Sequence, residues 1–303
     1  MATFTLQSVP DLTGTTAIVT GANTGLGRVT ARALAAQGAR VLLAVRSTDK
    51  GQRAAATMTG DVEVRRLDLA DLTSVRSFAA GVQEPVDLLV NNAGLMVPPL
   101  GHTADGFELQ FGTNHLGHFA LTNLLLPRLR GRVVTVSSHA HRAGRIDLED
   151  PHWEHRPYRP FGAYGQSKLA NLLFAGELQR RLAAAGSEVL SMSAHPGLAT
   201  TDLLRTTDLR WFSVFTERVA LRMFAQDDVG GALPTLHAAV GDLPGNSYIG
   251  PRGRLRAQRD SGPVGRSRRA SDVETARRLW SLSEELTGVA FPFPARAAGA
   301  TAH

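Results

Sequence analysis

A tyrosine and a lysine lie four residues apart in the segment YGQSK, at Tyr164 and Lys168. On a helix this spacing is about one turn, so both side chains project from the same face. A phenol with a pKa of about 10 is a weak acid–base at neutral pH, but a nearby ammonium favours the phenolate and lowers that pKa. The pair therefore indicates proton transfer to or from an oxygen. The alternative is an exposed Tyr–Lys pair without function, which is what this spacing alone means in most sequences.

A glycine-rich turn, TGANTGLG, occupies residues 20–27. Glycine is required where the backbone has positive φ or must approach a ligand closely. A helix is predicted to begin inside this turn, and the free N–H groups at a helix N-terminus favour a phosphate. The spacing differs from the G-x-G-x-x-G pattern, so the glycines alone could mark a simple turn. A strand on one side and a helix on the other favour phosphate binding.

Both features need a scaffold, and the first half of the chain predicts one. Short apolar runs alternate with segments of helical spacing, which is typical of a parallel sheet covered on both faces. Right-handed crossovers then give a doubly wound sheet. The predicted strands are residues 16–20, 40–45, 61–67, 86–91 and 131–138, and the predicted helices are residues 25–37, 48–58, 72–82 and 111–129.

The second half begins with a polar, His- and Pro-rich segment, residues 139–162, which we interpret as an inserted loop. Without a linker or a composition break, residues 1–294 are predicted to form one domain, followed by a disordered tail, 295–303. The remaining elements are predicted as a helix at 163–185, a strand at 188–196, mostly amphipathic helix at 198–240, a short strand within 241–253 and a helix at 273–286.

Composition narrows the class of protein. Of the 303 residues, 43% are hydrophobic and 20% are charged, as in ordinary globular proteins. The absence of cysteine excludes disulfides, thiolate metal sites and cysteine nucleophiles. The N-terminus has no secretory pattern and no segment suits a bilayer span. We therefore expect a soluble, cytoplasmic protein.

Taken together, the motifs resemble the short-chain dehydrogenase/reductase superfamily, and phrases such as FGTNHLGHF and SKLANLLF resemble its retinol-dehydrogenase-like branch. The resemblance implies a single Rossmann-type α/β domain with a predominantly parallel, seven-stranded sheet. The motifs follow the family's order: TGANTGLG (20–27), LDL (67–69), NNAG (91–94), GTNHLGHF (112–119), VSS (136–138), YGQSK (164–168) and HPG (195–197).

The resemblance also implies catalytic roles. Tyr164 would act as general acid in carbonyl reduction and as base in alcohol oxidation. Lys168 would lower its pKa and hold the nicotinamide ribose. Ser138 would hydrogen-bond the substrate oxygen, with Ser137 as the alternative, and Asn114 would hold a water that links Lys168 to solvent. No metal is needed for this hydride chemistry.

Cofactor-binding residues follow from the same resemblance. They would contact the phosphates, the adenosine and the nicotinamide of a dinucleotide. Besides Tyr164 and Lys168, they are Gly21, Asn23, Thr24, Gly25, Leu26, Gly27, Arg46, Asp68, Leu69, Asn91, Ala93, Gly94, Pro196, Gly197, Leu198 and Thr201.

The second predicted strand ends in Arg46, where NAD-binding Rossmann folds carry an acidic residue that accepts from the ribose hydroxyl. An arginine cannot accept a hydrogen bond, but it can bind a 2′-phosphate. We therefore expect NADP rather than NAD. Thr24 provides no second cation, and Arg28 is either a substitute or an ordinary helix residue.

Ser138 and Tyr164 are 26 positions apart, about twice the separation usual in the superfamily. The inserted loop supplies the extra residues, and a similar insertion occurs in the retinol-dehydrogenase-like branch. In this family residues 198–230 cap the substrate. The apolar stripe there is expected to be mostly core, and some of its residues are expected to face a lipophilic ligand, among Leu204, Trp211, Phe212 and Phe215.

Other clusters are interpreted as structural. The loop histidines are irregularly spaced and are expected to be solvated, whereas His195 is expected to pack. The Arg-rich segment 252–269 lacks nucleic-acid motifs, so we expect a solvated loop or a subunit contact, which leaves a homo-oligomer open. The loop histidines are His139, His141, His152 and His155.

The sequence thus predicts an NADP-dependent oxidoreductase that interconverts a carbonyl compound and an alcohol, acting on a small lipophilic molecule. A catalytically silent dinucleotide-binding interaction module is the alternative from another class, and the same chemistry with NAD is a second alternative. The intact set of Asn114, Ser138, Tyr164 and Lys168 argues against the silent module. Substrate identity, direction, stereochemistry and oligomeric state are not set by these residues.

Overall fold

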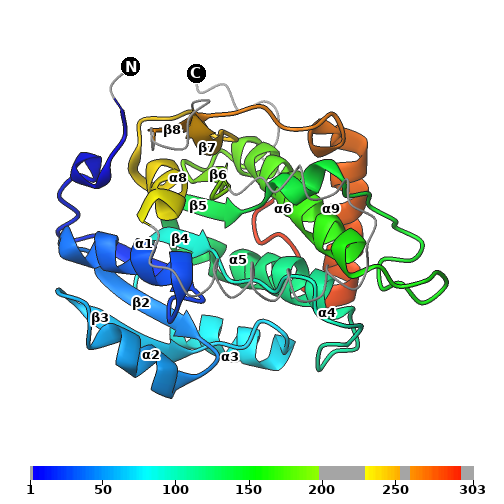
Figure 1. The fold of residues 1–303 in the computed structure, drawn as a ribbon, viewed down its shortest axis with the longest axis horizontal. Helices are drawn as coiled ribbons and strands as arrows, with labels where there is room; N and C mark the ends of the chain where they lie inside the picture. Colours follow the sequence, from blue (N-terminus) through cyan, green and yellow to red (C-terminus); the bar gives the residue numbers. More distant parts are fainter. Residues whose placement is uncertain (1–2, 198–228, 253–259, 295–303) are drawn as a thin grey trace, which may run out of the picture.

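The computed structural model describes residues 3–197, 229–252 and 260–294, which form an eight-stranded sheet with helices on both faces (Figure 1). The strand order is β3-β2-β1-β4-β5-β6-β7-β8, and only the β7–β8 pair is antiparallel. The strands are β1 (Thr16–Thr20), β2 (Arg40–Val45), β3 (Val62–Arg66), β4 (Val86–Asn91), β5 (Leu129–Val136), β6 (Leu190–Ala194), β7 (Tyr248–Arg252) and β8 (Asp260–Pro263).

Helices α1, α2 and α8 cover one face of the sheet, and α3, α5 and α6 cover the other, with α9 packed against α6 (Figure 1). The main helices are α1 (Gly25–Ala36), α2 (Thr48–Ala55), α3 (Leu72–Gly81), α5 (Gly117–Leu125), α6 (Pro160–Ala184), α8 (Val229–Val240) and α9 (Val273–Thr287). Before α5, the short helix α4 (Leu109–Phe111) continues into a π-helical turn, η2 (Gly112–Leu116).

The apolar runs form central strands because both of their faces are buried. In β2, Val41 and Leu43 pack in the core under α1, whereas Leu42 and Ala44 pack in the core under α3 and α5. Successive side chains point to opposite faces of a strand, so a continuous apolar run is what a doubly covered strand requires.

Local signals fix where the helices begin and end. The Asp71 carboxylate accepts from two backbone N–H groups at the start of α3, and Asp272 does the same for α9. Pro160 occupies the first turn of α6, where its missing N–H costs nothing. Gly288 ends α9 in the left-handed conformation, with φ of 60°.

The strand order reverses between β1 and β4, which lie side by side at the centre of the sheet. In open α/β sheets, ligands bind at such a switch point, beyond the carboxyl ends of the strands. The glycine-rich turn follows β1 at this edge, so the fold places the expected phosphate site there.

Several element boundaries differ from the sequence prediction. The segment 252–269 was expected to be a loop, but its residues 260–263 form the eighth strand, antiparallel to β7. The sequence there, Asp-Ser-Gly-Pro, has no β-branched residue and gives no strand signal. Helix α6 begins at Pro160 rather than Ala163, and the inserted segment contains a short 3-10 helix, η4 (His139–Arg142).

We expect thermal unfolding in a single transition, as predicted for one domain, because the sheet is continuous from β3 to β8. Circular dichroism at 222 nm and tryptophan fluorescence should report the same midpoint. The dinucleotide expected from the sequence, at about 100 times its dissociation constant, should stabilise the protein by roughly 2.7 kcal/mol. Two separate transitions, with only one of them sensitive to the dinucleotide, would contradict a single domain.

Candidate active site

The turn after β1 packs tightly against the segment that follows β4. Gly21 has a φ of +67°, and a Cβ there would lie 3.0 Å from the Cα and Cβ of Ala93. A Cβ on Gly27 would overlap Asn92 and the Gly21 carbonyl. The Thr20 hydroxyl accepts from the backbone N–H groups of Asn92 and Ala93, both at 2.9 Å. Glycine is therefore required here to bring the two segments together.

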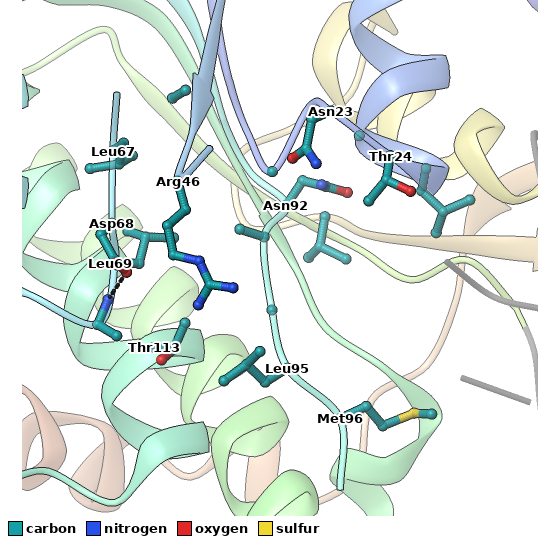
Figure 2. Close-up of a pocket in the computed structure, with 18 of the residues that line it drawn as sticks. Asn23, Thr24, Arg46, Leu67, Asp68, Leu69, Asn92, Leu95, Met96 and Thr113 are labelled. Atoms are coloured by element: carbon teal, nitrogen blue, oxygen red, sulfur yellow. Dashed lines mark hydrogen bonds between the residues drawn. The ribbon is translucent and has the colours of Figure 1, made fainter. Parts of the chain in front are cut away.

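These two segments border a cavity of about 560 Å³. It extends from the end of β2 to the α6 residues Tyr164 and Lys168, and most of the residues expected from the sequence line it. Figure 2 shows part of this lining, including Asn23, Arg46 and Asp68. Its expected lining residues are Gly21, Asn23, Thr24, Leu26, Gly27, Arg46, Asp68, Leu69, Ala93, Gly94, Tyr164, Lys168 and Pro196.

Arg46 lies at one end of this cavity. Its side chain extends from the end of β2 toward the space beside Asp68 and Leu69 (Figure 2). Lys50, in the first turns of α2, lines the same end. Across the described ranges, no carboxylate forms an ion pair with either cation. This end of the cavity is therefore suited to a phosphate.

Tyr164 and Lys168 lie at the other end, one turn apart on α6, and both are buried. The Lys168 Nζ is 5.7 Å from the centre of the Tyr164 ring and donates to the Val136 carbonyl at 3.3 Å. Burial lowers the pKa of Lys168 to about 8. The ammonium is therefore the main form below that pH.

Burial raises the pKa of Tyr164 to about 12, although a hydrogen bond with Ser138 opposes that shift. The expectation that Lys168 holds this pKa below its usual value is thus not met in the free protein. The physical reason is that a phenolate in this enclosed site loses its hydration. Tyr164 is protonated at neutral pH, which is the form that donates a proton.

The structure separates the two serines of VSS. The Ser137 hydroxyl donates to the Lys168 backbone carbonyl at 2.7 Å, so it joins β5 to α6. Ser138 is half-buried and close enough to Tyr164 for its hydroxyl to favour the phenolate and so act to lower the Tyr164 pKa, and it accepts from the Ala140 N–H. Ser138 is therefore the serine placed beside the phenol, as its assignment from the resemblance requires.

Asn114 lies in the π-helical turn η2 and is fully buried. Its side-chain amide donates to the Leu95 carbonyl at 3.0 Å and to the Ser167 hydroxyl at 2.9 Å. Its side-chain oxygen accepts from the Leu95 N–H at 2.7 Å. The side chain thus joins the segment after β4 to α6, and its expected role in holding a water stays a prediction.

The remaining expected residues lie elsewhere. Gly25 is buried in the first turn of α1, and Gly197 has a φ of +88° and packs against Pro251. Asn91 does not line the cavity but donates to the Thr122 hydroxyl at 2.9 Å in the core. Leu198, Thr201 and almost all of the expected capping region 198–230 lie outside the described residues.

Sequence reasoning missed Asn92, Lys50, Met96 and Thr113, which all line the cavity. Asn92 was identifiable, because side chains alternate along a strand and Asn91 at the end of β4 points into the core. Lys50 lies on α2 and so shares no sequence motif with Arg46. Only the packing of α2 beside β2 brings the two together.

The expectation of solvated loop histidines was wrong for His141. This side chain is fully buried, and its Nδ1 donates to the Ser138 carbonyl at 2.7 Å. Burial lowers its pKa to about 4. His195 packs as expected and is buried, with its ring centre 4.4 Å from that of His139. His155 is exposed, and His139 and His152 are half-buried.

Within residues 3–197, 229–252 and 260–294, no three acidic or histidine side chains are grouped to hold a metal ion. In the same residues, no helix is both long and apolar enough to span a bilayer.

Comparisons with known proteins agree on one family. The family model described as short chain dehydrogenase matches residues 15–210. Human retinol dehydrogenase 13 is 43% identical over 92% of this chain and 86% of its own length. Polyprenol dehydrogenase from Mus musculus is 42% identical over 92% of this chain and 86% of its own length. A solved structure of an uncharacterized protein from Mycobacterium paratuberculosis has a TM-score of 0.83 and 55% identity, covering 96% of this chain and all of that one.

Proposed function

The chain belongs to the short-chain dehydrogenase family, and from that premise we propose that it uses NADP(H) to interconvert a lipophilic carbonyl compound and its alcohol. The family membership makes it an NAD(P)-dependent oxidoreductase of the retinol-dehydrogenase-like branch. The cofactor preference, the proton carrier and the substrate class are the parts that we propose.

The proposal rests on one observation, which is that the two ends of a single cavity are lined by side chains of different chemistry. One end has the buried Tyr164 and Lys168, and the other has Arg46 and Lys50. A proton carrier beside a cation is suited to a reacting oxygen. Two cations that pair with no carboxylate among the described residues are suited to a phosphate. A dinucleotide with an extra phosphate fits both ends.

The chain's own residues provide the site for that cofactor. Helix α1 begins at Gly25 beside the cavity, and the backbone N–H groups at a helix N-terminus favour a phosphate. Asp68 and Leu69 line the cavity next to Arg46, where the adenosine would lie. When bound, the nicotinamide supplies or accepts the hydride.

Tyr164 moves the proton in this proposal. During carbonyl reduction, its hydroxyl donates a proton to the substrate oxygen, and during alcohol oxidation it takes that proton back. Ser138, which lies beside Tyr164, donates to the same oxygen and orients it. The Lys168 ammonium stabilises the phenolate that remains after the proton has left.

The substrate class follows from the lining and from the relatives. The cavity lining includes the apolar residues Leu95, Met96, Pro98 and Leu109. Retinol and polyprenol, which give two relatives their names, are both lipophilic alcohols. We therefore propose a lipophilic substrate, without choosing a compound.

The Arg46→Ala variant is expected to bind NADPH roughly ten- to a hundredfold more weakly and NADH unchanged. A hydrogen bond to a charged group contributes about 1.5–3 kcal/mol, which corresponds to this range. Lys50→Ala should have a smaller effect in the same direction, because Lys provides a single point charge rather than a planar fork. Titration calorimetry measures the dissociation constant of each dinucleotide for each of the two variants.

Arg40→Ala is the matched control, because Arg40 begins the same strand at its opposite end and is paired with Glu63 at 2.8 Å. It should leave both dissociation constants unchanged. Equal dissociation constants for NADPH and NADH in the wild-type protein would refute the proposed preference and favour NAD as an equal cofactor.

A further inference from the structure

A short segment after β4, residues 95–98, forms an apolar wall of the cavity through Leu95, Met96 and Pro98. We call residues 95–98 the wall segment. Its backbone is held at two points by side chains of one helical stretch. Asn114 bonds both the N–H and the carbonyl of Leu95, and the Gln110 side-chain oxygen accepts from the Val97 N–H at 2.9 Å. Met96, between these two points, lines the cavity (Figure 2).

The second point holds the backbone in an unfavourable conformation. Val97 has a φ of 57°, in the left-handed region that β-branched residues rarely adopt. Such a residue persists only where its surroundings impose the conformation, and such residues are concentrated at functional sites. The bond from the Val97 N–H to Gln110 is the polar contact that holds the wall segment at this residue.

Gln110 also connects the wall to the catalytic helix. It is fully buried, and its side-chain nitrogen donates to the Pro160 carbonyl at 2.9 Å and to the Tyr158 hydroxyl at 3.0 Å. Pro160 begins α6, one turn before Tyr164. The Tyr158 hydroxyl in turn donates to the buried Glu108 carboxylate at 3.0 Å. One amide therefore links the wall segment, the inserted loop and the start of α6.

We propose that Gln110 is a positioning residue that fixes the wall segment relative to Tyr164, and that it thereby sets the preference of the enzyme for long apolar substrates. Tyr158 supports it by holding the Gln110 amide in place. This inference rests on the proposed function for its substrate, but the contacts that carry it belong to the chain alone. Neither residue touches the reacting atoms.

Two variants test whether Gln110 imposes the strain at Val97. Val97→Gly removes the conformational cost at positive φ. We compare its effect on Tm in two backgrounds, the wild type and Gln110→Ala. The effect should be about 2 °C more stabilising in the wild-type background, because the wall segment is free to relax in Gln110→Ala. Asn246→Gly is the matched control, because Asn246 has a φ of 65° but lies between α8 and β7. Its effect on Tm should be the same in both backgrounds.

Selectivity is measured with two probes, butanal and decanal, with NADPH as reductant. In Gln110→Ala, the ratio of kcat/KM for decanal to that for butanal should fall about tenfold, because a displaced wall loses contact with the longer chain. The loss should lie mainly in the KM for decanal, with the NADPH dissociation constant unchanged. Tyr158→Phe, which removes only a hydroxyl, should shift the ratio in the same direction to a smaller extent. This variant takes the place of Gln110→Ala in the test if Gln110→Ala does not fold.

The outcomes separate this inference from the proposed function. Additive Tm changes for Val97→Gly and Gln110→Ala, or an unchanged ratio in both Gln110→Ala and Tyr158→Phe, would overturn the inference. An equal fall in kcat/KM for both aldehydes would also overturn it, since that is the result of a general structural defect. If the wild-type protein reduces neither aldehyde, the proposed function fails. In that case the ratio of the dissociation constants of decanamide and butanamide for the NADPH complex, measured by calorimetry, replaces the ratio of kcat/KM.

Discussion

The Tyr164→Phe variant is expected to lose about 10²–10⁴-fold in kcat while it binds NADPH almost as well as the wild-type protein. The buried phenol is protonated, with its pKa raised to about 12, which is the form that donates a proton to the carbonyl oxygen in the proposed reaction. Phenylalanine keeps the ring and its packing, including the contact with Phe161 at 6.4 Å between ring centres. Only the proton is lost. Steady-state rates with an aldehyde and calorimetric NADPH binding measure the two quantities.

Tyr248→Phe is the matched control, because Tyr248 is also buried but does not line the cavity. It should keep most of the wild-type rate. If Tyr164→Phe retained more than about a tenth of the wild-type rate, a different group would have to carry the proton.

The Lys168→Met variant is expected to lose both turnover and cofactor affinity. Its ammonium is expected to bond the ribose hydroxyls and to stabilise the phenolate, so its removal should weaken NADPH binding roughly ten- to a hundredfold and lower kcat at least as far as a lost proton carrier does, about 10²-fold. The thermal midpoint should be equal to or above that of the wild type, because burial disfavours the charge at this position. Calorimetry, steady-state kinetics and thermal melts distinguish these effects.

The pH dependence provides a second measurement on the same residue. Since burial lowers the pKa of Lys168 to about 8, the ammonium is present below that pH and is lost above it. The affinity of the wild-type protein for NADPH should therefore fall as the pH rises through about 8, and Lys168→Met should show no change in this range. Wild-type affinity in Lys168→Met, or the same pH profile in both proteins, would contradict the assigned role.

Much of the scaffold was predictable because its signals are local. Apolar runs such as residues 40–45 identify central strands, and the turn 20–27 combines a strand, glycines and a helix in one short stretch. The position of α6 follows from its long helical pattern, within three residues at its start. In each case the property that defines the element is carried by neighbouring residues.

Features that depend on distant residues were not predictable. Strand β8 forms because β7 offers an edge and not because its own sequence favours a strand. Lys50 joins Arg46 through the packing of α2, and Val97, whose φ is positive, donates to Gln110 13 positions further along the chain. Burial of Tyr164 was likewise invisible in the sequence, which is why the direction of its pKa shift in the free protein was expected wrongly.

The end of β5 and the middle of α6 are joined by hydrogen bonds that each of them donates to the other. The Ser137 hydroxyl donates to the Lys168 carbonyl, while the side chains of Lys168 and Asn171 both donate to the Val136 carbonyl. These three bonds hold the end of β5 to the middle of α6 without using residues 145–157 of the chain that connects the two elements. Exchanging residues 145–157 for segments of other length or composition would therefore leave this connection between β5 and α6 in place.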